Sequence, residues 1–379
     1  MLYRSILRPV LFRLPPESAH ELALQSLSLA LSSDWARRMV ARRLSSAPLG
    51  EIRRFGLSFK NPVGLAAGFD KNGTAAQALS ALGFGFIEVG TVTHLPQPGN
   101  ARPRLFRLPM DRALINRLGF NNHGAAEVAR QIAAHRPDCV LGINIGKSRA
   151  VEVEDAIPDY LASFEWVHPL ADYITINVSS PNTPSLRELQ RAEALKALLD
   201  ALQTRNRELA EKREGAAPVP LLVKIAPDLE ERELEAIVDV VSGAKMAGII
   251  ATNTTTSRVG LRTTPGVIQS CGAGGLSGAP LRASSNAVIA SLYRLTRGRL
   301  PIVGVGGIFT AADAWEKICA GASLVQLYTG FIYEGFGIVR DINEGLAKIL
   351  DEQGFRSLDE AVGSRALELA APARPAGEF

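Results

Sequence analysis

Eight short apolar segments recur along the chain, and stretches with helical periodicity separate them. Most of these segments are almost continuously apolar, which is typical of strands that are buried on both faces of a parallel sheet. Eight such strands alternating with helices predict a (β/α)8 (TIM) barrel, and a doubly wound sheet is the alternative. The segments lie at 63–69, 84–93, 140–146, 173–180, 221–227, 248–253, 302–307 and 324–330.

The composition suits a single large domain with a small extension. The chain has 379 residues, of which 46% are hydrophobic, and its formal net charge of +4 is too small to indicate nucleic-acid binding. Its three cysteines, Cys139, Cys271 and Cys319, lie far apart in sequence and indicate free thiols in a reducing compartment. Neither a transmembrane run nor a signal peptide is evident, so we expect a cytosolic or membrane-surface protein.

Three parts are expected: a helical extension at 1–45, a barrel at 46–355 and a loose tail at 356–379. The extension has helical patterns at 17–31 and 34–44. The second pattern combines Trp35, Met39 and Val40 with four arginines, which fits either a membrane-surface helix or a helix packed on the barrel with solvated arginines. Two long connections, 94–138 and 254–300, follow the second and sixth strands, where barrel active sites are built.

Polar residues gather just beyond the predicted strands, where a barrel has its mouth. They include two lysines and four asparagines: Lys71, Lys224, Asn144, Asn177, Asn182 and Asn253. Each asparagine alone fits a turn or a cap, but together their amides could bind a flat heterocycle. Lys224 lies between apolar residues and therefore needs an anionic partner or a shifted pKa. "GVGGI", "YTG" and "GGLSG" suit a phosphate site, and no His, Cys or acidic cluster suggests a metal.

Taken together, the motifs resemble those of the class 2, quinone-dependent dihydroorotate dehydrogenases, over roughly residues 1–350. The matching segments, in chain order, are "AAGFDKNG", "EVGTVT", "PQPGNARPRLFRL", "INRLGFNN", "INIGKS", "NVSSPNTPSLRELQ", "VKIAPDL", "ATNTT", "GGLSG", "GVGGI" and "QLYTG". This resemblance implies an FMN-binding barrel that oxidises dihydroorotate to orotate in pyrimidine synthesis. It also implies a membrane quinone as the electron acceptor.

The resemblance further implies roles for individual residues. Ser180 matches the catalytic base, which takes the proton from C5 of dihydroorotate while C6 passes a hydride to N5 of FMN. Thr183 and Phe120 match residues along the proton route, whereas Ser179 matches no catalytic position. Matches to FMN-binding positions are Ala67, Gly68, Phe69, Asp70, Lys71, Thr91, Asn144, Asn177, Lys224, Thr252, Gly278, Gly307, Tyr328 and Thr329. Matches to substrate-binding positions are Lys71, Asn116, Arg117, Leu118, Gly119, Phe120, Asn177, Asn182, Asn253 and Thr254.

For the quinone, the nearest matches to the family's histidine and arginine are His20 and either Arg102 or Arg104. His94 and Leu95 depart from the pattern of many relatives, which affects only the expected quinone contacts. The implied location is the cytoplasmic side of the cell membrane, as a peripheral protein, with a monomer as one option.

Two alternative functions would require different sequence features. A class 1 enzyme using fumarate or NAD would lack the extension and would carry Cys at position 180. A non-catalytic barrel that binds membranes would not need Lys71, Ser180 and Lys224 together.

Overall fold

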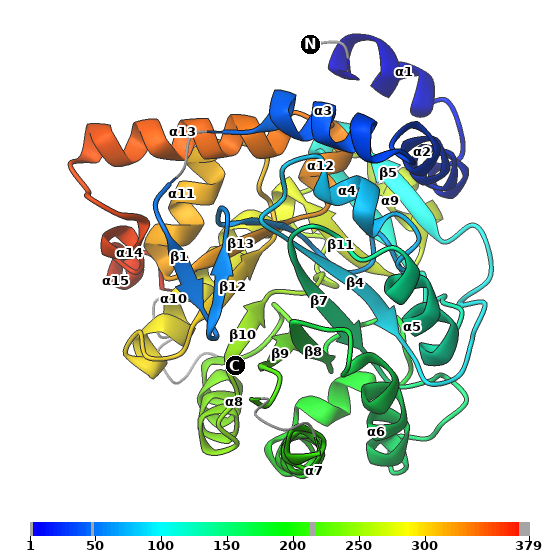
Figure 1. Cartoon of the computed structure of the whole chain (residues 1–379), viewed down its shortest axis with the longest axis vertical. Coiled ribbons are helices and arrows are strands. Elements are labelled where there is room, and N and C mark those ends of the chain that lie inside the picture. Colours follow the sequence, from blue (N-terminus) through cyan, green and yellow to red (C-terminus); the bar gives the residue numbers. More distant parts are fainter. Residues whose placement is uncertain (1–2, 47–48, 213–216, 371–379) are drawn as a thin grey trace.

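In the computed structural model, which describes residues 3–46, 49–212 and 217–370, eight parallel strands close into a barrel (Figure 1). Around the barrel the order is β3, β4, β7, β8, β9, β10, β12 and β13, so strands adjacent in the ring follow one another along the chain. The eight predicted strands and the fold class are confirmed. The strands span Val63–Leu65, Phe86–Val92, Val140–Ile145, Tyr173–Asn177, Leu221–Ile225, Gly248–Ala251, Ile302–Val305 and Leu324–Leu327.

Most of the predicted apolar segments run past the carboxyl ends of the strands, and these extra residues form the mouth of the barrel. β4 and β7 pair from Phe86 and Val140 onward, with a register shift between Gly90 and Val92. Such a bulge redirects a side chain, here that of Thr91, which lines the mouth.

Helices surround the barrel and cover the outer faces of its strands (Figure 1). α7 shows why the pattern predicts this: Leu195, Leu198, Leu199 and Leu202 are fully buried, as expected for one helical face. α11 starts with a capping box in which Thr310 and Asp313 bond each other's backbone. The covering helices are α4 (Ala76–Ser80), α5 (Ala125–Ala134), α6 (Ala156–Val167), α7 (Ala192–Glu211), α8 (Glu231–Gly243), α10 (Arg282–Thr296), α11 (Ala311–Ala320), α12 (Thr329–Glu334) and α13 (Ile338–Gln353).

The two long connections pair with each other at the mouth. They form an antiparallel sheet of β5 (Leu105–Leu108), β6 (Ala113–Asn116) and β11 (Gly275–Gly278), with α9 (Pro265–Cys271) beside it. At the other end of the barrel, a hairpin of β1 (Ile52–Arg54) and β2 (Leu57–Phe59) brings Phe59 against Phe86. The remaining short turns are η2 (Pro109–Asp111), η3 (Leu186–Gln190) and η4 (Ala279–Leu281).

The amino-terminal extension lies across one side of the mouth, near α12 and β5 (Figure 1). It contains η1 (Tyr3–Leu7), α1 (Arg8–Leu11), α2 (Pro16–Ala30) and α3 (Asp34–Leu44), so both predicted helices are confirmed. The sequence allowed a packed helix with solvated arginines, but one of them, Arg37, is buried. It donates to the carbonyl oxygens of Leu31 and Ser32, both at 2.9 Å, and so caps the end of α2.

The carboxyl-terminal segment differs from the expected loose tail. Residues 356–370 carry α14 (Leu358–Ala361) and α15 (Ala366–Leu369), and α15 packs on α10. Ala361 and Ala366 are buried, so apolar contacts hold this segment to the barrel. The rest of the expected tail, 371–379, lies outside the described residues.

Candidate active site

A pocket of about 1000 Å³ opens at the carboxyl ends of the barrel strands, and we call it the mouth pocket. Polar and glycine residues from separate strand ends line it together, as a barrel requires. Most of the predicted site residues lie in its wall: Ala67, Gly68, Lys71, Thr91, Asn116, Leu118, Gly119, Phe120, Asn177, Ser180, Asn182, Lys224, Thr252, Asn253, Thr254, Gly278, Gly307, Tyr328 and Thr329.

Four predicted residues lie elsewhere. Asp70 is buried and accepts hydrogen bonds from the backbone of Thr74 (3.1 Å) and Ala75 (2.8 Å) just before α4, a local turn role. The guanidinium of Arg117 donates to backbone carbonyls at 271, 273 and 103. Asn144 lies behind the pocket wall, where its amide oxygen accepts from Thr91 at 2.6 Å. Phe69 lines a second pocket, described below.

Ser180 and Ser179 are neighbours with different surroundings. The Ser179 hydroxyl is fully buried, donates to Asn177 (3.0 Å) and accepts from the amide of Asn253 (2.9 Å). The Ser180 hydroxyl lines the mouth pocket and accepts from the backbone N–H of Asn182 at 3.2 Å. Among the described residues, the buried Thr183 hydroxyl nearby has no hydrogen-bond partner. Ser180 is therefore the serine that is available for chemistry.

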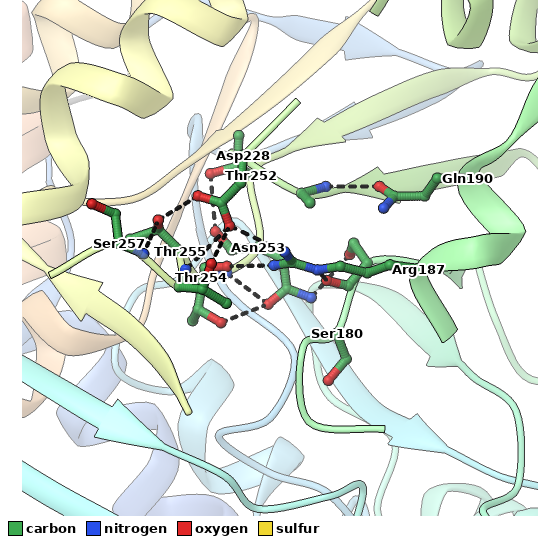
Figure 2. A network of polar contacts seen from close by, with 12 residues as sticks. Ser180, Arg187, Gln190, Asp228, Thr252, Asn253, Thr254, Thr255 and Ser257 are labelled. Atoms are coloured by element: carbon green, nitrogen blue, oxygen red, sulfur yellow. Dashed lines mark hydrogen bonds and ion pairs between the residues drawn. The ribbon is translucent and has the colours of Figure 1, made fainter. Parts of the chain in front are cut away.

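Arg187 attaches the loop that carries Ser180 to the neighbouring strand ends (Figure 2). Its guanidinium donates to the carbonyl oxygens of Ser179 and Thr254, both at 3.2 Å, and to the carboxylate of Asp228 at 3.1 Å. Asp228 in turn accepts from the hydroxyl of Thr255 and from the backbone of Thr256. The Arg187 side chain thus joins the loops that follow β8, β9 and β10. No simple sequence motif indicates this role of Arg187.

Replacing Arg187 with glutamine should loosen this loop. The backbone amides of residues 179–186 should exchange with deuterium roughly 10- to 100-fold faster, because charge-assisted hydrogen bonds to three partners are lost. Asp228→Asn should also speed the exchange of these amides, but by a smaller factor. The control is Arg205→Gln, which removes a surface pair between α7 and Glu165; equal exchange in all three variants would contradict the role.

A carboxylate in the middle of the barrel organises the floor of the mouth pocket. Glu88 is fully buried and accepts from Asn144 (2.8 Å), Tyr173 (3.0 Å) and Gln326 (2.9 Å). Burial lowers the pKa of Lys224, and the negative charge of Glu88 partly offsets this effect. The sequence predicted an anionic partner or a shifted pKa for Lys224. The pKa is lowered, and Glu88 is the nearby anionic group, although only the lone glutamate in the apolar run "FIEVGTV" signalled it in the sequence.

The wall of the pocket has features that suit a phosphate group and a flat ring. Gly278, Gly306 and Gly307 have φ values of +103°, +124° and +73°, and a side chain at Gly307 would collide with Arg282. Here the backbone itself can approach an anion closely. Gln326 lines the pocket, and its buried amide oxygen is an acceptor that has no hydrogen-bond partner among the described residues.

A second pocket of about 680 Å³, the side pocket, lies between the extension and the barrel. Its wall is mainly apolar, with Leu11, Phe12, Pro16, Ala19 and Ala23 from the extension and Phe69, Leu105, Leu114, Phe331 and Ile332 from the barrel. The two pockets share Tyr328, and the adjacent residues Gly68 and Phe69 line one pocket each. The pockets therefore adjoin.

Two basic residues give the side pocket its polar contacts. His20 donates to the carbonyl oxygen of Phe69 at 2.8 Å, and burial together with the charge of Lys71 lowers the pKa of His20 to about 4. The arginine in the wall is Arg107, which donates to the carbonyl oxygen of Leu14 at 2.8 Å. The sequence predicted either Arg102 or Arg104 at this place. Both pair with Glu17 instead, and neither lies in the wall of the side pocket.

The described residues contain no group of three His, Cys, Asp or Glu side chains that could hold a metal ion. In the same part of the chain, no helix combines the length and apolar character needed to cross a membrane.

The fold and the site define a class: a (β/α)8 barrel whose polar mouth pocket adjoins an apolar side pocket. Residues 51–350 match the sequence model of the dihydroorotate dehydrogenase family. A dihydroorotate dehydrogenase (quinone) of Gloeobacter violaceus is 53% identical, covering 96% of this chain and 98% of that protein. One from Mycobacterium marinum is 50% identical, with coverages of 97% and 99%.

Solved structures agree with the sequence comparison. The structure of an Eimeria tenella DHODH in complex with ferulenol matches with a TM-score of 0.82 and 36% identity, covering 92% of this chain and 95% of that one. The chain therefore belongs to the dihydroorotate dehydrogenase family, in its quinone-dependent class, a flavin-dependent family of oxidoreductases.

Proposed function

We propose that this protein oxidises dihydroorotate to orotate in the mouth pocket, with FMN as its cofactor, and reduces a membrane quinone in the side pocket. The observation that carries the proposal is the shared wall of the two pockets at Tyr328 and at Gly68–Phe69. A polar pocket suits a charged pyrimidine and an apolar one suits a quinone, so one flavin between them could serve both.

The glycine-lined wall and the Gln326 oxygen would hold FMN, together with Lys224. When bound, the flavin supplies the acceptor for the hydride from C6 of dihydroorotate. Lys224 brings a positive charge to the flavin side of the pocket. Ser180 is placed to take the proton from C5, and the unpartnered Thr183 hydroxyl offers the next acceptor along a proton route.

Asparagines from three segments would recognise the pyrimidine edge. Asn116 and Asn182 bond each other at 3.1 Å, and Asn253 reaches from the end of β10. Their amides can offer donors and acceptors to the dione, while Lys71 supplies a cation for the carboxylate.

Lys71 gives substrate binding a defined pH dependence. Burial lowers the pKa of Lys71 to about 8; Arg104 adds to this effect, while Glu17, Asp70 and Glu21 oppose it. Below that pH the free enzyme already carries the charge, whereas above it the ligand can bind only with proton uptake. We expect the Kd for orotate to rise by about tenfold per pH unit above pH 8.

The measurement is an orotate titration of the holoenzyme between pH 7 and 9, followed by flavin absorbance. Lys71→Gln should weaken binding by roughly 10- to 100-fold at pH 7 and remove the slope, because a charged hydrogen bond is lost. A slope that persists in Lys71→Gln would show that another group is responsible.

The extension is also proposed to rest on the cytoplasmic face of the membrane. Ile6, Val10, Leu29, Trp35 and Met39 are all more than half exposed, at 51–78%. Apolar side chains on a helical layer beside an apolar pocket suit insertion at the lipid boundary, where a quinone could enter.

A two-step reaction tests the proposal. Anaerobic dihydroorotate should bleach the flavin of the purified protein, and a short-chain quinone should restore its colour. Restoration by fumarate or NAD, but not by quinone, would refute the assigned acceptor, and failure to bleach would refute the substrate.

A further inference from the structure

One carboxylate of the extension pairs with an arginine of the connection that follows β4 and lies in the wall of neither pocket. Glu17 on α2 accepts from Arg104 through Nε (3.1 and 3.2 Å) and NH2 (2.6 Å). The side chains are only 15% and 6% exposed. Removing one partner of such a buried two-pronged pair leaves an uncompensated charge, so the pair has a strong geometric effect on its surroundings.

Arg104 also holds the loop that follows β4 through hydrogen bonds. Its remaining nitrogen donates to the carbonyl oxygens of Pro98 (2.5 Å) and Asn100 (2.9 Å). Between them, Gly99 has a φ of +78°, and a side chain there would lie 2.7 Å from Arg104. The carbonyl oxygen of Leu118 would lie even closer, so only glycine suits this position, and the two hydrogen bonds from Arg104 fix the loop on either side of it.

Asn100 then connects the loop to two segments of the substrate pocket. Its amide donates to the carbonyl oxygens of Arg117 (2.8 Å) and Asn182 (3.3 Å), and its backbone N–H donates to Leu118 (3.1 Å). Asn182 in turn bonds Asn116. Both linked segments line the mouth pocket, and one of them carries Ser180.

We propose that Glu17 is a positioning residue for the substrate, acting through Arg104 and Asn100 on the segments that hold Asn116 and Asn182. This inference rests on the proposed function. The extension then has a second role besides the side pocket: it shapes the pyrimidine half of the mouth pocket. Glu17 also adds negative charge beside Lys71 and so favours the protonated lysine that binds the carboxylate.

Three other hydrogen bonds from the extension to the barrel do not continue in this way. Tyr3 donates to the carbonyl oxygen of Ile332 (2.6 Å), Arg8 to that of Tyr333 (3.0 Å) and Ser28 to that of Thr74 (3.4 Å). Each donates to a barrel carbonyl outside the mouth pocket wall and serves to dock the helices. Glu17 is distinguished by an unbroken series of hydrogen bonds that reaches the substrate residues.

The test compares Glu17→Gln with Glu21→Gln in the FMN-loaded full-length protein. Glu21 lies one helical turn away, is half exposed and pairs with Arg102, which also pairs with Glu17 but not with the buried Arg104. In Glu17→Gln we expect the Kd for orotate and the KM for dihydroorotate to rise about tenfold, the size seen for residues that act through others. The kcat with a short-chain quinone should stay within about twofold. Glu21→Gln also removes a negative charge near Lys71, so it can lower the pH above which orotate binding weakens, but its Kd for orotate at pH 7 should stay within about twofold of the wild type.

The pH profile tests the charge that Glu17 adds beside Lys71, separately from the positioning through Arg104 and Asn100. Without the Glu17 charge, the pH above which orotate binding weakens should fall below that of the wild type, and a mere loss of stability would not move it. Asn100→Ala, which leaves the buried pair intact, should also weaken orotate binding about tenfold even if Glu17→Gln folds poorly.

Unchanged orotate affinity in both Glu17→Gln and Asn100→Ala would overturn the inference and leave the pair as a docking contact. If the wild type itself failed to bind orotate, the proposed function would be wrong instead, so the two failures are distinguishable.

Discussion

Replacing Ser180 with alanine is expected to slow flavin reduction by dihydroorotate by a factor on the order of 10² to 10⁴, the usual contribution of a general base. Ser180 lines the mouth pocket, and its hydroxyl accepts only from the backbone of Asn182 among the hydrogen bonds of the described chain. The fold and bound FMN should persist, because one lost hydroxyl costs about 1–3 kcal/mol. Anaerobic stopped-flow absorbance of the flavin measures the rate directly.

Ser179→Ala is the matched control for this experiment. Its hydroxyl is committed to Asn177 and Asn253, so its loss should alter affinity and stability more than the reduction rate. Ser180→Cys should retain part of the activity, because a thiol can serve as the base in class 1 relatives. Near-normal reduction in Ser180→Ala, or an equal loss in Ser179→Ala, would show that Ser180 is not the base.

The barrel could be predicted from sequence because each strand is specified locally. A parallel strand buried on both faces is mostly apolar, as in Ile302–Val305, and a covering helix shows one apolar face, as α7 does. These signals need no knowledge of distant residues, and all eight strands followed from them.

The sheet across the mouth could not be predicted, because its strands come from insertions that are far apart. β6 pairs with β11, and Asn116 lies opposite Gly275, 159 positions later in the chain. Nothing in either segment alone specifies such a pairing. The burial of Arg37 has a similar origin, because its partners are the free carbonyls at the end of the preceding helix.

The site residues also differ in how far the sequence alone could place them. Residues that directly follow the strands, such as Lys224 and Asn253, were placed correctly at the mouth. Motif membership does not specify where side chains point, and those of Asp70 and Arg117 bond the backbone outside the pocket. Arg107 was missed because the sequence offers three arginines within six residues and only the fold decides which one faces the side pocket.

Filling the side pocket should stop quinone turnover while leaving dihydroorotate oxidation intact. Ala23→Trp would project an indole from α2 into the apolar wall near His20 and Phe69. Reoxidation of the reduced flavin by a quinone should fall on the order of 10²-fold, equivalent to losing about 3 kcal/mol of binding. Flavin reduction by dihydroorotate should stay within about twofold, since the indole lies outside the mouth pocket.

Such a substitution is a sharper test than removing the extension. Deletion of residues 1–45 would also remove Glu17 and so expose the buried charge of Arg104. Both half-reactions could then decline together for reasons unrelated to a quinone entrance. Ala30→Trp, at an exposed position on the same helix, controls for the added ring. If Ala23→Trp reoxidised as fast as Ala30→Trp with both short- and long-chain quinones, the quinone would have to reach the flavin by another route.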